Sequence, residues 1–485
     1  MTLKPASMAL AVALALSGCT LAPSYEQPPS PVPDQFREGA DATQVTLPGW
    51  RDFFAEPELQ QLIQTALANN RDLRLAMLDV EELRAQYRIQ RADLFPDIGL
   101  NGTGTRQRVP GDLSNTGESQ VQSQYGANVG ISAYELDLFG RVRSLKDAAL
   151  QNYLASEEAQ RSAHITLVSE VANAYLTLVA DRENLRISEE TMEAYRSSLD
   201  LTQRRFDLGV GSELELRQAQ TALETARANR ARFARLVAQD RNALATLVGA
   251  PLPPLPNDNL EASGLVELSG VPSGLSSNVL LARPDIIRAE HLLRAANANI
   301  GAARAAFFPS ISLTGTFGTS SAELDGLFES GSRSWSFSPS ISLPIFTGGR
   351  NRASLDVAEV RRDQSVATYE QTIQTAFQEV SDALVARETL LEQEIAQQAL
   401  VDATRRSLEL SQQRYELGAD DYLAVLDAQR SLLTARQELV SITLSKLANQ
   451  ITLYRALGGG WLEDQATVIN TAPEQEDSDT SGTQG

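Results

Sequence analysis

The chain has 485 residues, and its 62 acidic and 42 basic side chains give a net charge of −20, which argues against nucleic-acid phosphate as a partner. Hydrophobic residues make up 42% of the sequence, enough to build real cores, so the chain is not a disordered protein. With one cysteine, Cys19, and two histidines, neither a disulfide framework nor a Cys/His metal site can be assembled. We therefore expect no metal and no cofactor.

The first residues read as an export signal. Lys4 precedes a short apolar run at 8–16, and small residues lead up to Cys19, as in a signal peptide spanning 1–18. The stretch LSGC at 16–19 resembles the lipobox of bacterial lipoproteins, which implies that Cys19 is acylated; an ordinary signal with an incidental cysteine is the alternative. Thr20 rather than an aspartate follows, as in lipoproteins sorted to the outer membrane. Beyond the signal no run of 18 apolar residues occurs, so we expect no helix to span a membrane.

A proline-rich segment with a short helix is expected at 19–70, and a first repeat at 71–249. Within the repeat, apolar residues at helical spacing predict a helix at 71–95 that ends at Pro96. Alternating residues then predict two strands, separated by a polar stretch at about 106–124. The run 141–208 contains neither Gly nor Pro and is rich in good helix formers, which predicts a helix of 68 residues, about 100 Å long.

A tight turn at Gly209, Val210 and Gly211 leads into a shorter return helix at about 212–248, where Ser212 and Glu215 form a capping box. A linker rich in Pro, Gly and Ser occupies 250–283.

The second repeat, 284–459, has the same order of elements. RFDLG at 205–209 recurs as RYELG at 414–418, and AQTALETAR at 219–227 recurs as AQRSLLTAR at 428–436, both 209 residues later. We therefore expect a helix from Pro284, two strands around a polar stretch at about 319–334, a second 68-residue helix at 350–417, and a return helix at about 421–457. The second turn comprises Gly418, Ala419 and Asp420, and either Asp420 or Asp421 caps the helix that follows. An acidic, disordered tail is expected at 460–485.

The strands have two unlike faces. In SISLTGTFG at 310–318, Ile311, Leu313 and Phe317 lie on one face and hydroxyl-bearing residues on the other. This pattern favours a transmembrane barrel, and a soluble sandwich is the alternative. Four strands cannot close a barrel, and open edges are not tolerated in lipid, so the chain must combine its strands with those of other copies.

Three stretches carry a family resemblance: 48–73, 280–315, and the YELG turn with the following LDAQRSLLTARQEL. They resemble the outer-membrane efflux proteins, the TolC-like exit ducts, and most closely the lipoprotein branch that serves proton-driven multidrug pumps. The resemblance implies a mainly α fold with a β-barrel part. Three copies would form a 12-stranded barrel in the outer membrane and an α-helical tunnel in the periplasm. A periplasmic adaptor protein would connect this homotrimer to an inner-membrane proton-driven transporter, and at Pro96 and Pro309 the tunnel wall would become barrel wall.

The resemblance also implies a gate at the periplasmic end. Tyr415 and Glu215 occupy the places of a tyrosine and a carboxylate that tie neighbouring hairpins shut, and Asp427 matches a constriction aspartate. Asp421 is assigned to the same gate, whereas Ala424 stands where relatives carry a second aspartate. The alternatives are that Glu215 only completes the capping box and that Asp427 is a solvated helix residue. The two turns are expected to dock the adaptor, although glycine C-caps alone would also explain them.

The sequence contains no phosphate-binding loop and no recognisable nucleophile–histidine pair, so an enzyme is not expected. We expect a passive exit duct for drugs or other small toxic compounds. A duct for type I protein secretion and a non-conducting, coiled-coil envelope lipoprotein are the alternatives.

Overall fold

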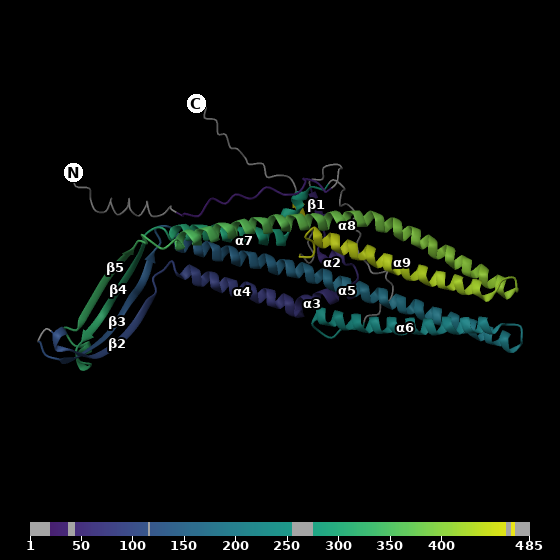
Figure 1. Cartoon of the computed structure of the whole chain (residues 1–485), viewed down its shortest axis with the longest axis horizontal. Coiled ribbons are helices and arrows are strands. Elements are labelled where there is room, and N and C mark those ends of the chain that lie inside the picture. The colour runs from purple at the N-terminus through teal and green to yellow at the C-terminus, as the bar shows by residue number, and fades with distance from the viewer. Residues whose placement is uncertain (1–19, 37–43, 115–116, 255–274, 462–466, 471–485) are drawn as a thin grey trace, which may run out of the picture. The chain divides into compact units, whose positions relative to one another are not determined.

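The structure is a computed structural model and describes residues 20–36, 44–114, 117–254, 275–461 and 467–470 (Figure 1). These residues form two compact units, each assembled from separate stretches of the chain. The first unit comprises the N-terminal segment up to Pro29 with 79–157 and 288–369, and the second comprises 30–78, 158–287 and the chain from Glu370 onward. The four helices that enter or leave the strands contribute residues to both units.

Most helices and strands of one half of the chain have a counterpart in the other half. The first half contains β1 (Gln44–Leu47), α2 (Trp50–Phe53), α3 (Pro57–Asn69), α4 (Arg71–Ala92), β2 (Ile98–Val109), η1 (Gly111–Leu113), β3 (Gln120–Leu136), α5 (Arg141–Asp207) and α6 (Glu213–Val248). The second contains η2 (Ser277–Ala282), α7 (Pro284–Ala305), β4 (Ser310–Ser321), η3 (Asp325–Phe328), β5 (Arg333–Ser342), α8 (Arg350–Glu416), α9 (Tyr422–Ala456) and β6 (Thr467–Asn470). From α4 and from α7 onward, the two halves contain corresponding helices and strands, whereas β1, α2, α3, η2 and β6 lie outside this correspondence. The two long helices are confirmed, at 67 residues each.

The first unit contains one antiparallel sheet in the order β2-β3-β4-β5, seen as neighbouring strands in Figure 1. Val129 pairs with Phe317, and Phe317 pairs with Trp335, so apolar side chains from three strands share one face. Asn128, Gly318 and Ser334 form the neighbouring row on the opposite, polar face. The two-faced strands expected from the sequence are therefore present.

The strands are longer than expected. The stretches 106–124 and 319–334 were expected to be polar connections, but β2 continues to Val109, β3 begins at Gln120, and β4 continues to Ser321. The pairing of Arg108 with Val121 and of Gln107 with Gln122 shows the reason. A ladder of backbone hydrogen bonds does not require apolar side chains. The amino-acid composition therefore locates the apolar part of each strand but not the residues at which the strand begins and ends.

Two glycines let β3 and β4 approach closely on the polar face. A Cβ atom at Gly318 would lie 2.1 Å from the carbonyl oxygen of Ala127, and one at Gly130 would lie 2.3 Å from that of Gly315. These are backbone atoms, so a side-chain rotation cannot relieve the clash. Farther along the same pair of strands the register shifts between Ile131 and Tyr134, and Ala133 takes a positive φ of 51°.

The first unit also holds an N-terminal strap, residues 20–27, which lies along α7. Asn297 donates from Nδ2 to the carbonyl oxygen of Pro23 at 2.8 Å, and the Tyr25 hydroxyl donates to Glu290 Oε1 at 3.0 Å. Gly301 makes room for the strap, because a Cβ there would lie 2.8 Å from Ala22 Cα. Burial, followed by the charge of Glu290, raises the pKa of Tyr25 to about 12, so this phenol remains a donor at neutral pH.

The second unit has an aromatic core where α2 meets the end of α9. The ring of Phe53 stacks on that of Tyr454 with centroids 4.0 Å apart, and the Tyr454 hydroxyl donates to the carbonyl oxygen of Pro48 at 2.7 Å. Nearby, β1 pairs with β6, so residues 467–470, in the stretch 460–485 that was expected to be a disordered tail, form a strand instead. Burial of these rings adds to the hydrophobic stabilisation that α5 supplies with buried side chains such as Val171, Tyr175 and Leu176.

One described helix, α5, is long and apolar enough over 18 residues to cross a membrane by composition, which the sequence reading did not anticipate. However, 61% of that window is buried inside the protein. The apolar window is therefore accounted for by packing within the fold.

Candidate functional site

The first helix turn closes by a Schellman motif. The N–H of Gly209 donates to the carbonyl of Phe206 at 2.9 Å, and that of Val210 donates to Arg205 at 3.0 Å. Gly209 has φ of 74°, which glycine adopts without strain. Ser212 then caps α6: its Oγ accepts from the Glu215 N–H at 3.2 Å, and Glu215 Oε2 accepts from the Ser212 N–H at 3.3 Å. The expected capping box is confirmed.

The second turn has the same backbone but different side-chain contacts. Gly418, with φ of 71°, donates to Tyr415, and Ala419 donates to Arg414 at 2.8 Å. Of the two candidate caps, Asp421 is the N-cap of α9, and its Oδ1 accepts from the Ala424 N–H at 3.3 Å. Asp420 instead forms a salt bridge with Arg414.

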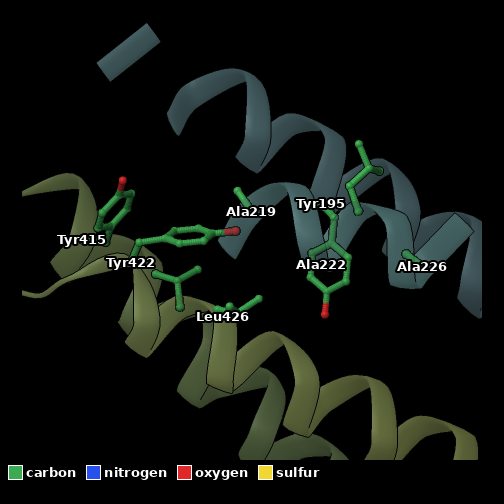
Figure 2. Packing of buried hydrophobic residues seen from close by; sticks show 9 residues of the cluster. Tyr195, Ala219, Ala222, Ala226, Tyr415, Tyr422 and Leu426 are labelled. Atoms are coloured by element: carbon green, nitrogen blue, oxygen red, sulfur yellow. The ribbon is translucent and has the colours of Figure 1, made fainter. Parts of the chain in front are cut away.

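A seam of buried residues joins the α5–α6 hairpin to the α8–α9 hairpin near these turns. Figure 2 shows Tyr422 reaching from α9 towards Ala219 on α6, while Tyr195 reaches from α5 towards α9. Ala219, Ala222 and Ala226 line the α6 side. Small residues there leave room for the tyrosine rings, so each hairpin inserts an aromatic side chain into the other.

Tyr415, the proposed gate tyrosine, is part of this seam and is only 5% exposed. Its ring centroid lies 5.7 Å from that of Tyr422 and 5.0 Å from the guanidinium carbon of Arg205. Burial raises the pKa of Tyr415, so the phenol is protonated at neutral pH. Among the described residues its hydroxyl has only a loose contact with Thr202, outside strict hydrogen-bond geometry. The carboxylate of Glu215, the expected gate partner, is held by the capping box instead.

The other residues assigned to the gate, Asp427 and Asp421, make contacts of their own. The Asp427 side chain is 65% exposed and has Arg430 at 3.8 Å from its carboxylate. Asp421 is occupied by its capping bond. The structure thus brings Tyr415 together with Arg205 and Tyr422, which the sequence reading did not single out.

A detectable sequence signal marks one of these missed residues. Tyr422 stands 209 residues after Glu213, so the two residues are equivalent in the repeat although one is aromatic and the other is a carboxylate. Such a break in the repeat, directly after a shared turn, points to a residue that the two hairpins use differently. By contrast, Arg205 and Arg414 are equivalent in the repeat and gave no signal.

The two helix-to-strand junctions are also alike. At the ends of α4 and α7 the last bonds tighten: Phe95 donates to Ala92 at 2.9 Å and Phe308 donates to Ala305 at 3.0 Å. Pro96 and Pro309 follow, and neither has an N–H to continue the helical ladder. The helix α4 therefore ends at Ala92, three residues before the limit of 95 that was expected from the sequence. Cys19, the expected lipidation site, lies outside the described residues.

Comparison with known proteins places these features in a family. The model of the outer membrane efflux protein family matches residues 62–250 and 275–459. The toluene efflux pump outer membrane protein TtgC of Pseudomonas putida is 52% identical over 470 residues, covering 94% of this chain and 96% of the relative. The antibiotic efflux pump outer membrane protein ArpC, also of Pseudomonas putida, has the same identity and coverage.

A solved structure agrees in fold. The open state of the MtrE outer membrane channel of Neisseria gonorrhoeae superposes with a TM-score of 0.82 at 42% identity, covering 92% of this chain and 99% of the channel. The family is one of passive outer-membrane efflux channels. The chain therefore belongs to the outer membrane efflux protein family and is an efflux channel of the outer membrane rather than an enzyme.

Proposed function

We propose that three copies of this chain form the exit duct of a tripartite pump, with a 12-stranded barrel in the outer membrane and a helical tunnel in the periplasm. The observation that carries this proposal is the sheet, which has four strands with β2 and β5 as edges. A four-stranded sheet cannot close on itself, and unpaired edges are costly in lipid. Joining β2 of one copy to β5 of the next removes every edge.

The two faces of the sheet support a barrel. On the apolar face, Trp335 is 77% exposed, and Phe337, Ile341 and Leu100 are also largely exposed in the single chain. Such a surface is unfavourable in water and suits lipid. Ser336, Ser338 and Ser340 alternate with these residues on β5, and their hydroxyls suit a water-filled interior.

We propose that the partners are a periplasmic adaptor and an inner-membrane, proton-driven transporter. A passive channel needs an energy source elsewhere, and both TtgC and ArpC are named as components of efflux pumps. Their names refer to toluene and to antibiotics, which supports drugs or other small toxic compounds as the cargo rather than proteins. The two glycine turns, exposed at the ends of their hairpins, are the proposed adaptor contacts.

Single-channel recording tests the duct. Purified protein reconstituted in a planar bilayer should give discrete conductance steps. A correctly assembled trimer that conducts nothing would instead support the structural-lipoprotein alternative. In cells, deletion of the gene should increase susceptibility to small toxic compounds without loss of a secreted protein, and the opposite pattern would favour type I secretion.

The gate is a second part of the proposal: Tyr415, Glu215, Asp421 and Asp427 control opening at the periplasmic end. A buried Tyr415 between two hairpins supports it, because separating the hairpins would expose that ring. Glu215→Gln is a clean probe, since glutamine can also complete a capping box and only the charge is lost. Combined with Tyr415→Phe it should raise the conductance above wild type, and Asp427→Asn should reduce cation preference. Unchanged values in both experiments would refute the gate while leaving the duct intact.

A further inference from the structure

The seam between the hairpins contains a groove of about 280 Å³. Its wall combines residues of three helices: Ser198 from α5, Gln412 and Tyr415 from α8, and Tyr422, Val425 and Gln429 from α9. The groove is therefore a property of both hairpins together and exists only while they are packed against each other.

By strict hydrogen-bond geometry, three buried polar atoms in this wall have no partner among the described residues: the hydroxyls of Tyr415 and Tyr422 and Oε1 of Gln429. Two of them have a looser contact with a neighbouring hydroxyl, Tyr415 with Thr202 and Tyr422 with Ser198. Burial raises the pKa of each phenol, and these contacts lower it by a smaller amount, as donation to the phenolic oxygen does. The three residues are 5%, 1% and 6% exposed. Buried polar atoms without partners are costly, each by an amount comparable to a lost hydrogen bond. Oε1 of Gln429 and the O–H groups of the two tyrosines are therefore available to a ligand in the groove.

The neighbouring contacts fix the roles of these atoms. Gln429 donates from Nε2 to Ser198 Oγ at 3.3 Å, which directs its amide nitrogen to Ser198 and leaves Oε1 as a free acceptor. Burial raises the pKa of Tyr415 and of Tyr422, so both phenols keep their protons and can donate. A ligand that satisfies the groove must therefore both accept and donate.

We propose that this groove binds a small, uncharged aromatic compound that carries a hydroxyl group. One hydroxyl both donates, to Gln429 Oε1, and accepts, from a tyrosine. An ammonium group can only donate. A carboxylate can only accept and would meet the carboxylate of Glu416 at the groove. The tyrosine rings and Val425 provide the apolar contact that an aromatic ring needs.

Binding has a consequence that rests on the proposed function. Because the groove is lined by both hairpins, a bound compound stabilises the packed arrangement and opposes their separation. Occupancy should therefore lower the frequency of channel opening.

Ligand-detected ¹⁹F NMR with 4-fluorophenol tests the site, and 4-fluorotoluene serves as the matched probe without a hydroxyl. Wild-type protein in detergent should broaden the 4-fluorophenol signal more than empty micelles do. Gln429→Leu and Tyr422→Phe should each weaken binding by about tenfold. Tyr195→Phe, which changes a tyrosine of the same seam outside the groove, should bind as wild type does.

Equal broadening by wild type and both groove variants would overturn the proposal, because it would show partition into detergent. Equal site-specific binding of 4-fluorotoluene would overturn it too, as would a crystal soaked with 4-fluorophenol that shows only water in the groove. In bilayers the conductance without probe tests the duct, whereas its reduction by 4-fluorophenol in wild type but not in Gln429→Leu tests the consequence of binding. The two proposals can thus fail separately.

Discussion

Arg414 donates two hydrogen bonds to Asp420, from Nε to Oδ2 at 2.7 Å and from Nη2 to Oδ1 at 2.8 Å, and so bridges the second helix turn. The first turn cannot form this bridge, because Gly211 stands 209 residues before Asp420. Each turn leads into a capped helix, but only the second turn also has a bidentate salt bridge across it.

The bridge predicts a local effect of Asp420→Asn. Loss of the charge should weaken both hydrogen bonds and speed the exchange of backbone amides around Gly418, measured by hydrogen-exchange mass spectrometry at pH 7. The first turn, at Gly209, is the internal control and should not change. Because the Arg414 side chain is exposed and that of Asp420 is partly exposed, high salt should reduce the difference between wild type and variant. Equal exchange at the second turn in both proteins would contradict the prediction.

The same bridge predicts a pH dependence. Its hydrogen bonds to Arg414 lower the pKa of the Asp420 carboxyl below its ordinary value. A lowered folded-state pKa stabilises the turn at pH values above the ordinary carboxyl pKa, and this contribution is lost as the pH falls through the lowered value. The second turn of the wild type should therefore come to behave like that of Asp420→Asn in acid, after correction for the intrinsic exchange rate. A wild-type turn that loosens instead on raising the pH from 5 to 8 would have the wrong sign.

Gly318→Ala should disrupt the sheet, because the new Cβ would press on the backbone of β3. We expect a loss of about 3 kcal/mol in the free energy of unfolding, measured by guanidinium denaturation, and a lower yield of folded protein. Gly102→Ala is the matched control, since a Cβ there meets nothing within 4 Å. Similar effects of both substitutions would show that loss of glycine flexibility, rather than crowding between β3 and β4, is responsible.

Gly301→Ala should release the N-terminal strap from α7. Its Cβ would lie 2.6 Å from Ser144 Oγ as well as against Ala22, so the strap and the helix cannot both keep their places. Amide exchange in residues 20–27 should increase, whereas exchange in β4 and β5 should not. Asn297→Ala, which removes one hydrogen bond to the strap, should have a smaller effect, of about 1 kcal/mol. Unchanged protection in Gly301→Ala would show that the strap is held elsewhere.

Cys19 is predicted to carry acyl chains at the start of the mature protein. Intact-mass spectrometry of protein purified from membranes should show a mass above that of residues 19–485 by the added lipid. Cys19→Ala should lose that increment, because it removes the only thiol in the chain. An unmodified thiol at residue 19 would end this assignment.

The architecture was predictable because the sequence patterns that indicate it extend over many residues. A run of 68 residues without Gly or Pro, and the 209-residue repeat, leave few alternatives for α5, α6, α8 and α9, and Pro284 does begin α7 as expected. The strand ends at Val109 and Gln120 were not predictable from composition, because outside the apolar band a paired strand and a polar loop have the same kinds of side chains.

The candidate site was predictable only in part. The turns at Gly209 and Gly418 and the capping box are formed by residues close together in the chain, so the local sequence is enough to predict them. Arg205 against Tyr415, or Tyr422 against the α6 alanines, are contacts between helices, and their partners depend on how two hairpins rotate against each other. A single sequence contains no direct measure of that rotation.

The N-terminal strap also constrains when the protein can finish folding. Pro23 and Asn297 are 274 residues apart in sequence, and Tyr25 and Glu290 are 265 apart. Closing so large a loop is entropically unfavourable, and the surface to which the strap binds does not exist until α7 has been synthesised and exported. The first residues of the strap to leave the ribosome must therefore wait for more than half of the chain before they can take their final place.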